Sequence, residues 1–213
     1  MQPSFVFRYL KAVENKIGKR ALFNDGKYKR YKELFLGAVL AQTIAESLEM
    51  DLFVQSPDED PPDFSLRHWI KDPPDSDKTT EGILNYEVVD YTGHSSGIHE
   101  VIDKKLARAY PEDYGIVVFF RHPTETTIDY DGLVERYKQE KRWVIFITRV
   151  TETKSGIKLL REKWLVAGLT NPRFQKIINP SMIDKPNLPQ VWRQSKRGLD
   201  IPLVEQDFRL ELP

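Results

Sequence analysis

The chain contains no cysteine and only four histidines among its 213 residues. The absence of cysteine excludes disulfide bonds, thiolate-ligated zinc or iron–sulfur sites and a thiol nucleophile. The scarcity of histidine argues against a metal site built from imidazoles. No run of about 18 apolar residues occurs, so no transmembrane helix is predicted. The first residues also lack the apolar core and cleavage site of a signal peptide, and we expect a soluble, cytoplasmic protein.

Charge is balanced over the whole chain but segregated along it. Lys and Arg together number 32, and so do Asp and Glu. Residues 2–42 hold nine basic and three acidic side chains, residues 43–113 hold six and seventeen, and residues 149–198 hold eleven and three. An acidic middle between basic flanks fits a carboxylate-lined metal site with basic walls that hold a polyanion. Ordinary solvated surface charge is the alternative explanation.

Apolar periodicity predicts an α/β fold in which helices flank a mixed central β-sheet. The predicted helices span residues 4–17, 29–49, 97–110 and 128–139. The predicted strands span residues 51–55, 63–70, 82–92, 114–120, 143–150 and 163–167. We divide the chain into an N-terminal helical extension (1–28), an α/β core (29–170) and an irregular, proline-rich C-terminal segment (171–213).

Acidic residues stand at informative places in this order of elements. Asp63 follows Pro62 at the start of a strand, Glu87 lies inside the next strand, and Glu46 and Glu49 are near the end of the preceding helix. Carboxylates on neighbouring strands can meet at one sheet edge, and Mg²⁺ typically takes one or two of them together with a substrate phosphate. Such an ion polarises a phosphodiester and lowers the pKa of an attacking water. The structural alternatives are a turn cap for Asp63 and solvent exposure for the helix glutamates.

In this order of helix, three strands, helix and strand, and in these acidic positions, residues 29–120 resemble the PD-(D/E)xK nuclease-like superfamily. The resemblance implies a restriction-endonuclease-like core in which Asp63 and Glu87 hold Mg²⁺ or Mn²⁺. It also implies that Glu46, or Glu49 in its place, is the helix carboxylate that places the attacking water. The implied activity is metal-dependent hydrolysis of phosphodiester bonds in nucleic acid, with DNA as the first candidate.

The sequence departs from the family pattern at the position of the motif lysine, which is Val89. A valine cannot stabilise the charge that develops during hydrolysis. One explanation is that Lys104 or Lys105, on the following helix, supplies the missing ammonium group. The other is that the site is inactive and the fold serves as a nucleic-acid-binding or protein-interaction module. Taking Asp90 as the motif acid does not restore the lysine, because Thr92 then stands in its place.

Two further features bear on function. Residues 93–97, bounded by Gly93 and Gly97, fit the G-x-S-x-G pattern of a serine-hydrolase nucleophile turn. The last histidine, His122, comes too early in the chain for the usual Ser, Asp, His order of the catalytic triad in such hydrolases.

The basic segment from Arg149 to Arg197 predicts contacts with nucleic-acid phosphates. A protein partner, including a second copy of this chain, is the alternative.

Overall fold

The computed structural model describes residues 1–58, 61–71, 79–92, 97–121, 129–150, 163–170 and 174–178. Its helices are α1 (Pro3–Ile17), α2 (Lys19–Asn24), the 3₁₀ turn η1 (Gly26–Tyr28), α3 (Lys29–Leu48), α4 (Ile98–Leu106) and α5 (Tyr130–Tyr137). Its strands are β1 (Phe53–Gln55), β2 (Phe64–Lys71), β3 (Thr79–Tyr91), β4 (Tyr114–Phe120), β5 (Val144–Val150), β6 (Lys163–Gly168) and β7 (Gln175–Ile178). The predicted α/β class with a mixed sheet is therefore confirmed.

The seven described strands form one sheet in which spatial order follows chain order. Strands β3, β4 and β5 are parallel to one another, and every other neighbouring pair is antiparallel. Parallel neighbours need a crossover, and helices α4 and α5 lie in the β3–β4 and β4–β5 connections. The carboxyl ends of β3, β4 and β5 consequently meet at a single edge of the sheet.

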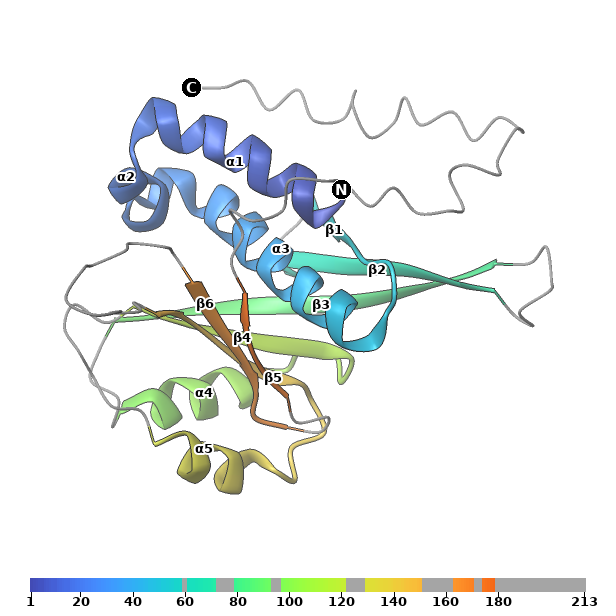
Figure 1. The fold of residues 1–213 in the computed structure, drawn as a ribbon. Helices are drawn as coiled ribbons and strands as arrows, with labels where there is room; N and C mark the ends of the chain where they lie inside the picture. The colour runs from blue at the N-terminus through green and yellow to red at the C-terminus, as the bar shows by residue number, and fades with distance from the viewer. Residues whose placement is uncertain are drawn as a thin grey trace, which may run out of the picture.

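Helices cover both faces of this sheet. Figure 1 shows α1 and α3 on one side and α4 and α5 on the other. Side chains of β4 alternate between the two faces and contribute to the core on each of them. Val117 and Phe119 belong to the core beneath α3. Ile116, Val118 and Phe120 belong to the core against α4 and α5. A strand that is apolar on both faces is expected at the centre of a parallel sheet.

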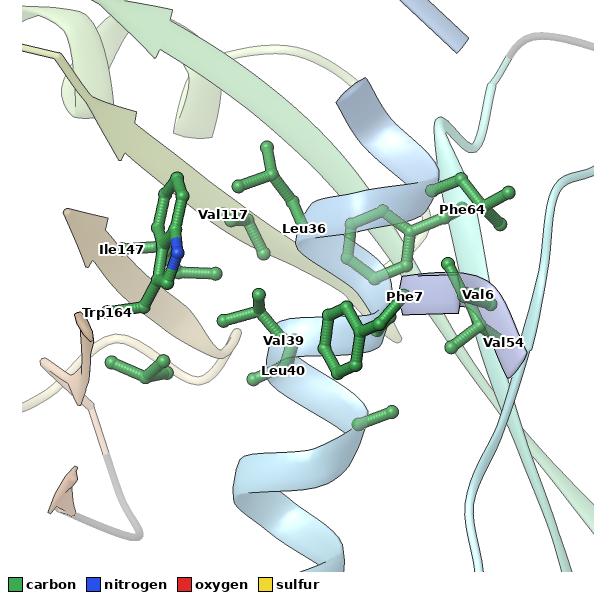
Figure 2. Close-up of a cluster of buried hydrophobic side chains, with 14 of the residues drawn as sticks. Val6, Phe7, Leu36, Val39, Leu40, Val54, Phe64, Val117, Ile147 and Trp164 are labelled. Atoms are coloured by element: carbon green, nitrogen blue, oxygen red, sulfur yellow. The ribbon is translucent and has the colours of Figure 1, made fainter. Parts of the chain in front are cut away.

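Helix α3 is enclosed between α1 and the sheet. Figure 2 shows Leu36, Val39 and Leu40 of this helix packed among side chains from α1, β1, β2 and the centre of the sheet. Each of the three is fully buried, and a buried side chain of this size contributes roughly 1.5–3 kcal/mol. Because apolar neighbours lie on two sides, α3 has little room for charged residues along its length.

The structure adds two elements that the sequence analysis did not predict. Helix α2 occupies six residues between α1 and η1 and buries Leu22 and Phe23. Strand β7 lies within the segment expected to be irregular and pairs with β6. Residues 171–173 and 179–213 of that segment lie outside the described residues. None of the helices in the described ranges has the length and apolar character needed to cross a membrane.

Gly37 sets the distance between α3 and the sheet. A Cβ atom at this position would lie 2.8 Å from Val54 Cγ1 and 2.9 Å from Phe64 Cδ2. We expect Gly37→Ala to lower the free energy of unfolding by about 1–2 kcal/mol, because overpacking outweighs the gain in helix propensity of about 1 kcal/mol. Urea unfolding followed by tryptophan fluorescence measures the change. Gly26→Ala is the matched control, since no atom lies within 4 Å of its added methyl group; a Gly37→Ala protein as stable as this control would contradict the packing argument.

Candidate functional site

Two buried carboxylates and one lysine meet where α3 begins. Lys29 is the first residue of α3, Glu33 lies one turn later, and Asp63 immediately precedes β2. The Lys29 Nζ atom is 3.2 Å from Glu33 Oε1 and 3.1 Å from Asp63 Oδ1. Glu33 is 5% exposed and Asp63 is 7% exposed. We call Glu33 and Asp63 the acidic pair.

The orientation of Asp63 follows from the way β2 begins. Its backbone N–H donates to the Tyr86 carbonyl at 3.0 Å, just beyond the first register pair, Phe64 with Tyr86. Its Oδ2 atom accepts a hydrogen bond of 2.6 Å from the backbone N–H of Val88. Pairing between β2 and β3 ends at Phe64, so the Val88 N–H has no backbone acceptor on β2, and the Asp63 carboxylate accepts its hydrogen bond instead. The Oδ1 atom of Asp63 faces Lys29.

The acidic pair has unusual electrostatics. Burial, together with the charge of Asp63 and a hydrogen bond to it, raises the pKa of Glu33 to about 8, although Lys29 acts in the opposite direction. Burial by itself would lower the pKa of Lys29, but hydrogen bonding and attraction to Asp63 and Glu33 raise it well above its ordinary value. The site therefore keeps a positive lysine beside a glutamate that exchanges its proton near neutral pH.

A second ionic cluster lies on the face of β3 that is covered by α3. Asp90 receives a bidentate contact from Arg121, with Nε to Oδ1 and Nη2 to Oδ2 both at 2.7 Å. Lys32 of α3 approaches Asp90 Oδ2 at 2.5 Å. This cluster ties α3 to the carboxyl ends of β3 and β4, the edge at which open α/β sheets commonly bind ligands.

Glu87 faces the opposite side of the sheet. Its neighbours Tyr86 and Val88 contact the core beneath α3, whereas Val89, two residues on, packs in the core against α4 and α5. Glu87 Oε2 lies 2.7 Å from Lys105 Nζ of α4. Its Oε1 atom is buried without a hydrogen-bond partner among the described residues. Strand alternation turns Glu87 toward Lys105 of α4, whereas Asp63, which precedes β2, reaches Lys29 of α3. The structure therefore does not bring these two carboxylates to one cation.

The two lysines of α4 differ. Lys105 reaches the sheet, and its Nζ atom also lies 5.4 Å from the centre of the Tyr110 ring. Burial would lower the pKa of Lys105, but the hydrogen bond and the charge of Glu87 outweigh it and raise that pKa. Lys104 is exposed on α4. Lys105 thus contacts the predicted acidic residue Glu87, and the residue at the motif-lysine position, Val89, belongs to an apolar core.

The predicted helix carboxylates lie at the other end of α3. Glu46 contacts Lys176 of β7 at 2.6 Å and accepts a hydrogen bond from Gln42 at 2.7 Å. Burial opposes the lowering of its pKa, which these two contacts produce. Glu49 caps the helix in the left-handed region, at φ 52°. Thirteen residues of helix separate Glu46 from Glu33, roughly 20 Å at 1.5 Å per residue, so Glu46 does not join the acidic pair.

Sequence reasoning missed Glu33 and Lys29, although a signal was present. Glu33 is separated by three, four and seven residues from Leu36, Gly37 and Leu40, so it lies on the buried stripe of α3. Lys29 stands four residues earlier, the spacing of an ion pair on a helix. A carboxylate inside the apolar stripe, with a lysine one turn before it, identifies a buried ionic site.

Several sequence-based hypotheses fall on residues that the structure does not describe. Residues 93–96 of the proposed serine-hydrolase turn, together with His122, are among them. So are most cations of the basic segment; Arg149, Lys163 and Lys176 are its described members. Within the described residues, no three His, Asp or Glu side chains are grouped so that they could hold a metal ion. A scan against protein-family models finds no match, and searches of curated proteins and solved structures likewise match nothing.

The raised pKa of Glu33 makes stability depend on pH. The folded state binds this proton more tightly than the unfolded state, so the stabilisation is complete below about pH 4.5 and is lost as pH rises to about 8. We expect Glu33→Gln to abolish that loss, which leaves the variant more stable than wild type at pH 8 by about 1–3 kcal/mol. Urea unfolding at a series of pH values measures this. Glu112→Gln, on the exposed turn before β4, should keep the wild-type profile; an unchanged profile in Glu33→Gln would show that Glu33 does not hold the proton.

The Glu87–Lys105 ion pair should show strong coupling. Lys105→Met leaves a buried carboxylate without its cation, and we expect a loss of about 3 kcal/mol in the free energy of unfolding. Adding Glu87→Gln removes the unpaired charge and should recover most of that loss. A double-mutant cycle from urea unfolding measures the coupling; additive effects of the two substitutions would mean that the pair does not exist in solution.

Proposed function

We propose that the chain is a nuclease-like protein that hydrolyses phosphodiester bonds in nucleic acid with a divalent metal ion. The observation that carries the proposal is the convergence of Glu33 and Asp63, both buried, on Lys29. The order α3, β1, β2, β3, α4, β4 supports it, because it is the order on which the resemblance to PD-(D/E)xK nucleases rests. The proposal keeps Asp63 of that resemblance and replaces Glu46 with Glu33.

The donor set of the acidic pair fits a hard cation. Burial and, after it, the charge of Asp63 raise the pKa of Glu33, and a divalent ion bound to both carboxyl groups would relieve their repulsion. Mg²⁺ needs only one or two carboxylates when water and substrate phosphate complete its coordination. Asp63 Oδ1 and Glu33 would hold the ion, while the Val88 N–H keeps the Asp63 carboxylate in place. When bound, Mg²⁺ or Mn²⁺ polarises the phosphodiester and acidifies a bound water.

The residues of the chain would divide the remaining work. The Glu33 carboxylate accepts a proton from the attacking water, whose oxygen bonds to phosphorus as the bond to the departing sugar oxygen breaks. That departing oxygen takes a proton from solvent. Lys29 remains positive at neutral pH and lies beside the pair, where it stabilises the added negative charge on the phosphate oxygens. It thus takes the role of the motif lysine that Val89 lacks.

A non-catalytic role is the second candidate. It is favoured by the contact of Lys29 with both carboxyl groups, because an ammonium group at that place can serve as a permanent substitute for a metal ion. In that case the fold would bind nucleic acid or a protein partner without cleaving it. The two candidates differ in whether a divalent ion displaces Lys29 from the acidic pair.

Metal binding and plasmid nicking separate these candidates. We expect the wild-type protein to bind Mn²⁺ in isothermal titration calorimetry and to nick plasmid DNA with Mg²⁺ or Mn²⁺. Asp63→Asn and Glu33→Gln should lose Mn²⁺ binding, and nicking should fall on the order of 100-fold or more. Lys29→Met should bind Mn²⁺ at least as well as wild type but lose nicking to a similar extent.

Control substitutions show which carboxylates bind the metal ion. Asp113→Asn, an exposed change of the same kind, should leave both readouts unchanged. Glu87→Gln and Lys105→Met test the site of the original resemblance on the α4 face. Loss of Mn²⁺ binding in Glu87→Gln with full binding in Glu33→Gln would overturn the present assignment. Absence of both Mn²⁺ binding and nicking in the wild-type protein would leave the non-catalytic role.

A further inference from the structure

Two arginines lie side by side at the carboxyl ends of parallel strands. Arg121 directly follows β4, and Arg149 is the penultimate residue of β5. The last register pair between these strands is Phe120 with Thr148, so the next position on each strand is an arginine. Both arginines follow, at a spacing of two, a residue of the core beneath α3, namely Phe119 and Ile147. They therefore share the sheet face on which the acidic pair lies.

Helix α2 and an aromatic cluster hold these arginines in place. The Arg149 guanidinium lies 5.6 Å from the centre of the Phe23 ring and 5.4 Å from that of Trp164. Arg121 donates a hydrogen bond of 2.8 Å to the Phe23 carbonyl. Arg121 is neutralised by Asp90, whereas Arg149 forms no ion pair with any carboxylate of the described chain. An arginine that is held by ring faces and still exposed keeps its hydrogen-bond donors available to an anion.

Arg149 has both a cation and a carboxylate near it, namely Lys19 of α2 and Glu14 of α1. Lys19, the first residue of α2, is close enough for the two charges to repel. Partial burial lowers the pKa of both side chains, Arg149 lowers that of Lys19 further, and the Glu14 carboxylate opposes both shifts. The exposed cations Lys16 and Arg20 flank Lys19 along the chain. The fold thus brings Lys19 close to Arg149, although the two residues are far apart in the sequence.

We propose that Arg149 and Lys19, next to Arg121, form a contact site for the phosphodiester backbone of nucleic acid. This inference rests on the proposed function and names the surface that presents the substrate to the acidic pair. From Arg149 the cations continue through Arg121 to Lys32, which share Asp90, and Lys32 lies on α3 one turn from Lys29. A polyanion that follows these residues reaches the acidic pair along the carboxyl ends of β5, β4 and β3.

The chemistry points to the backbone rather than to the bases. Trp164 is 1% exposed and Phe23 is 6% exposed, so their rings support the arginine and are not free to stack on a base. The cations are spread over α1, α2 and β5 and do not line a closed cavity, which fits a long polyanion better than a single phosphate. Backbone contacts of this kind carry no sequence information and depend strongly on salt.

Binding measured without catalysis tests the site. Fluorescence anisotropy with labelled single-stranded DNA, the matching duplex and an RNA of equal length, at about 50 and 200 mM salt and in EDTA, gives affinity and salt slope. We expect Arg149→Gln and Lys19→Gln each to reduce the slope of log K against log salt by about one. The double variant should bind roughly tenfold more weakly at the lower salt. Arg149→Lys should restore most of the affinity, because the charge is retained.

Lys138→Gln is the matched control, since Lys138 is exposed at the end of α5 on the opposite face. The proposal would be overturned if wild type, Arg149→Gln and Lys19→Gln had equal affinity and equal slope. It would also be overturned by an equal loss of affinity in Lys138→Gln, or by a wild-type protein that binds none of the three probes.

Mn²⁺ titration separates the nucleic-acid contact site from the proposed chemistry. A variant that loses nucleic-acid binding but still binds Mn²⁺ supports the contact site. If the wild-type protein binds nucleic acid but no Mn²⁺, the contact site stands and the nuclease proposal fails.

Discussion

The structure depends on the burial of α3 between α1 and the sheet. Glu33 lies on the buried side of this helix, so its carboxyl group must find its partners inside the protein. Lys29 contacts it from the first residue of the same helix, and Asp63 joins them from just before β2. The ionic site is thus a consequence of the layer packing. It holds the first turn of α3 against the start of β2, where the pairing of β2 with β3 ends.

The alternation of side chains along β3 then divides the remaining polar groups. Asp90 turns toward α3 and binds Lys32 and Arg121, whereas Glu87 turns toward α4 and binds Lys105. Each carboxylate is matched by a cation from the helix that covers its face. The parallel arrangement of β3, β4 and β5 adds the arginines at the carboxyl ends of the strands. One edge of the sheet therefore brings the acidic pair and Asp90 together with Lys29, Lys32 and Arg121.

The α/β class was predictable because the central strands β4 and β5 are apolar runs and α3 has clear helical spacing. The short helix α2 and strand β7 were not, because six and four residues carry too little periodicity. For the site, Asp63 was found from its place before a strand. The helix sequence indicates that Glu33 is buried, but its pairing with Asp63 depends on the contact between α3 and the start of β2, which the helix sequence does not encode. The meeting of Arg121 and Arg149 depends on the β4–β5 register, which no local pattern encodes.

The most direct test of this account is the anomalous diffraction of crystals soaked in Mn²⁺. The account predicts one peak bonded to Asp63 and Glu33, with the Lys29 ammonium group moved away from the two carboxylates and the contact from the Val88 amide to Asp63 retained. A peak at Glu87 or Glu46 would contradict it. So would the absence of any peak in crystals where Lys29 keeps both of its ion pairs.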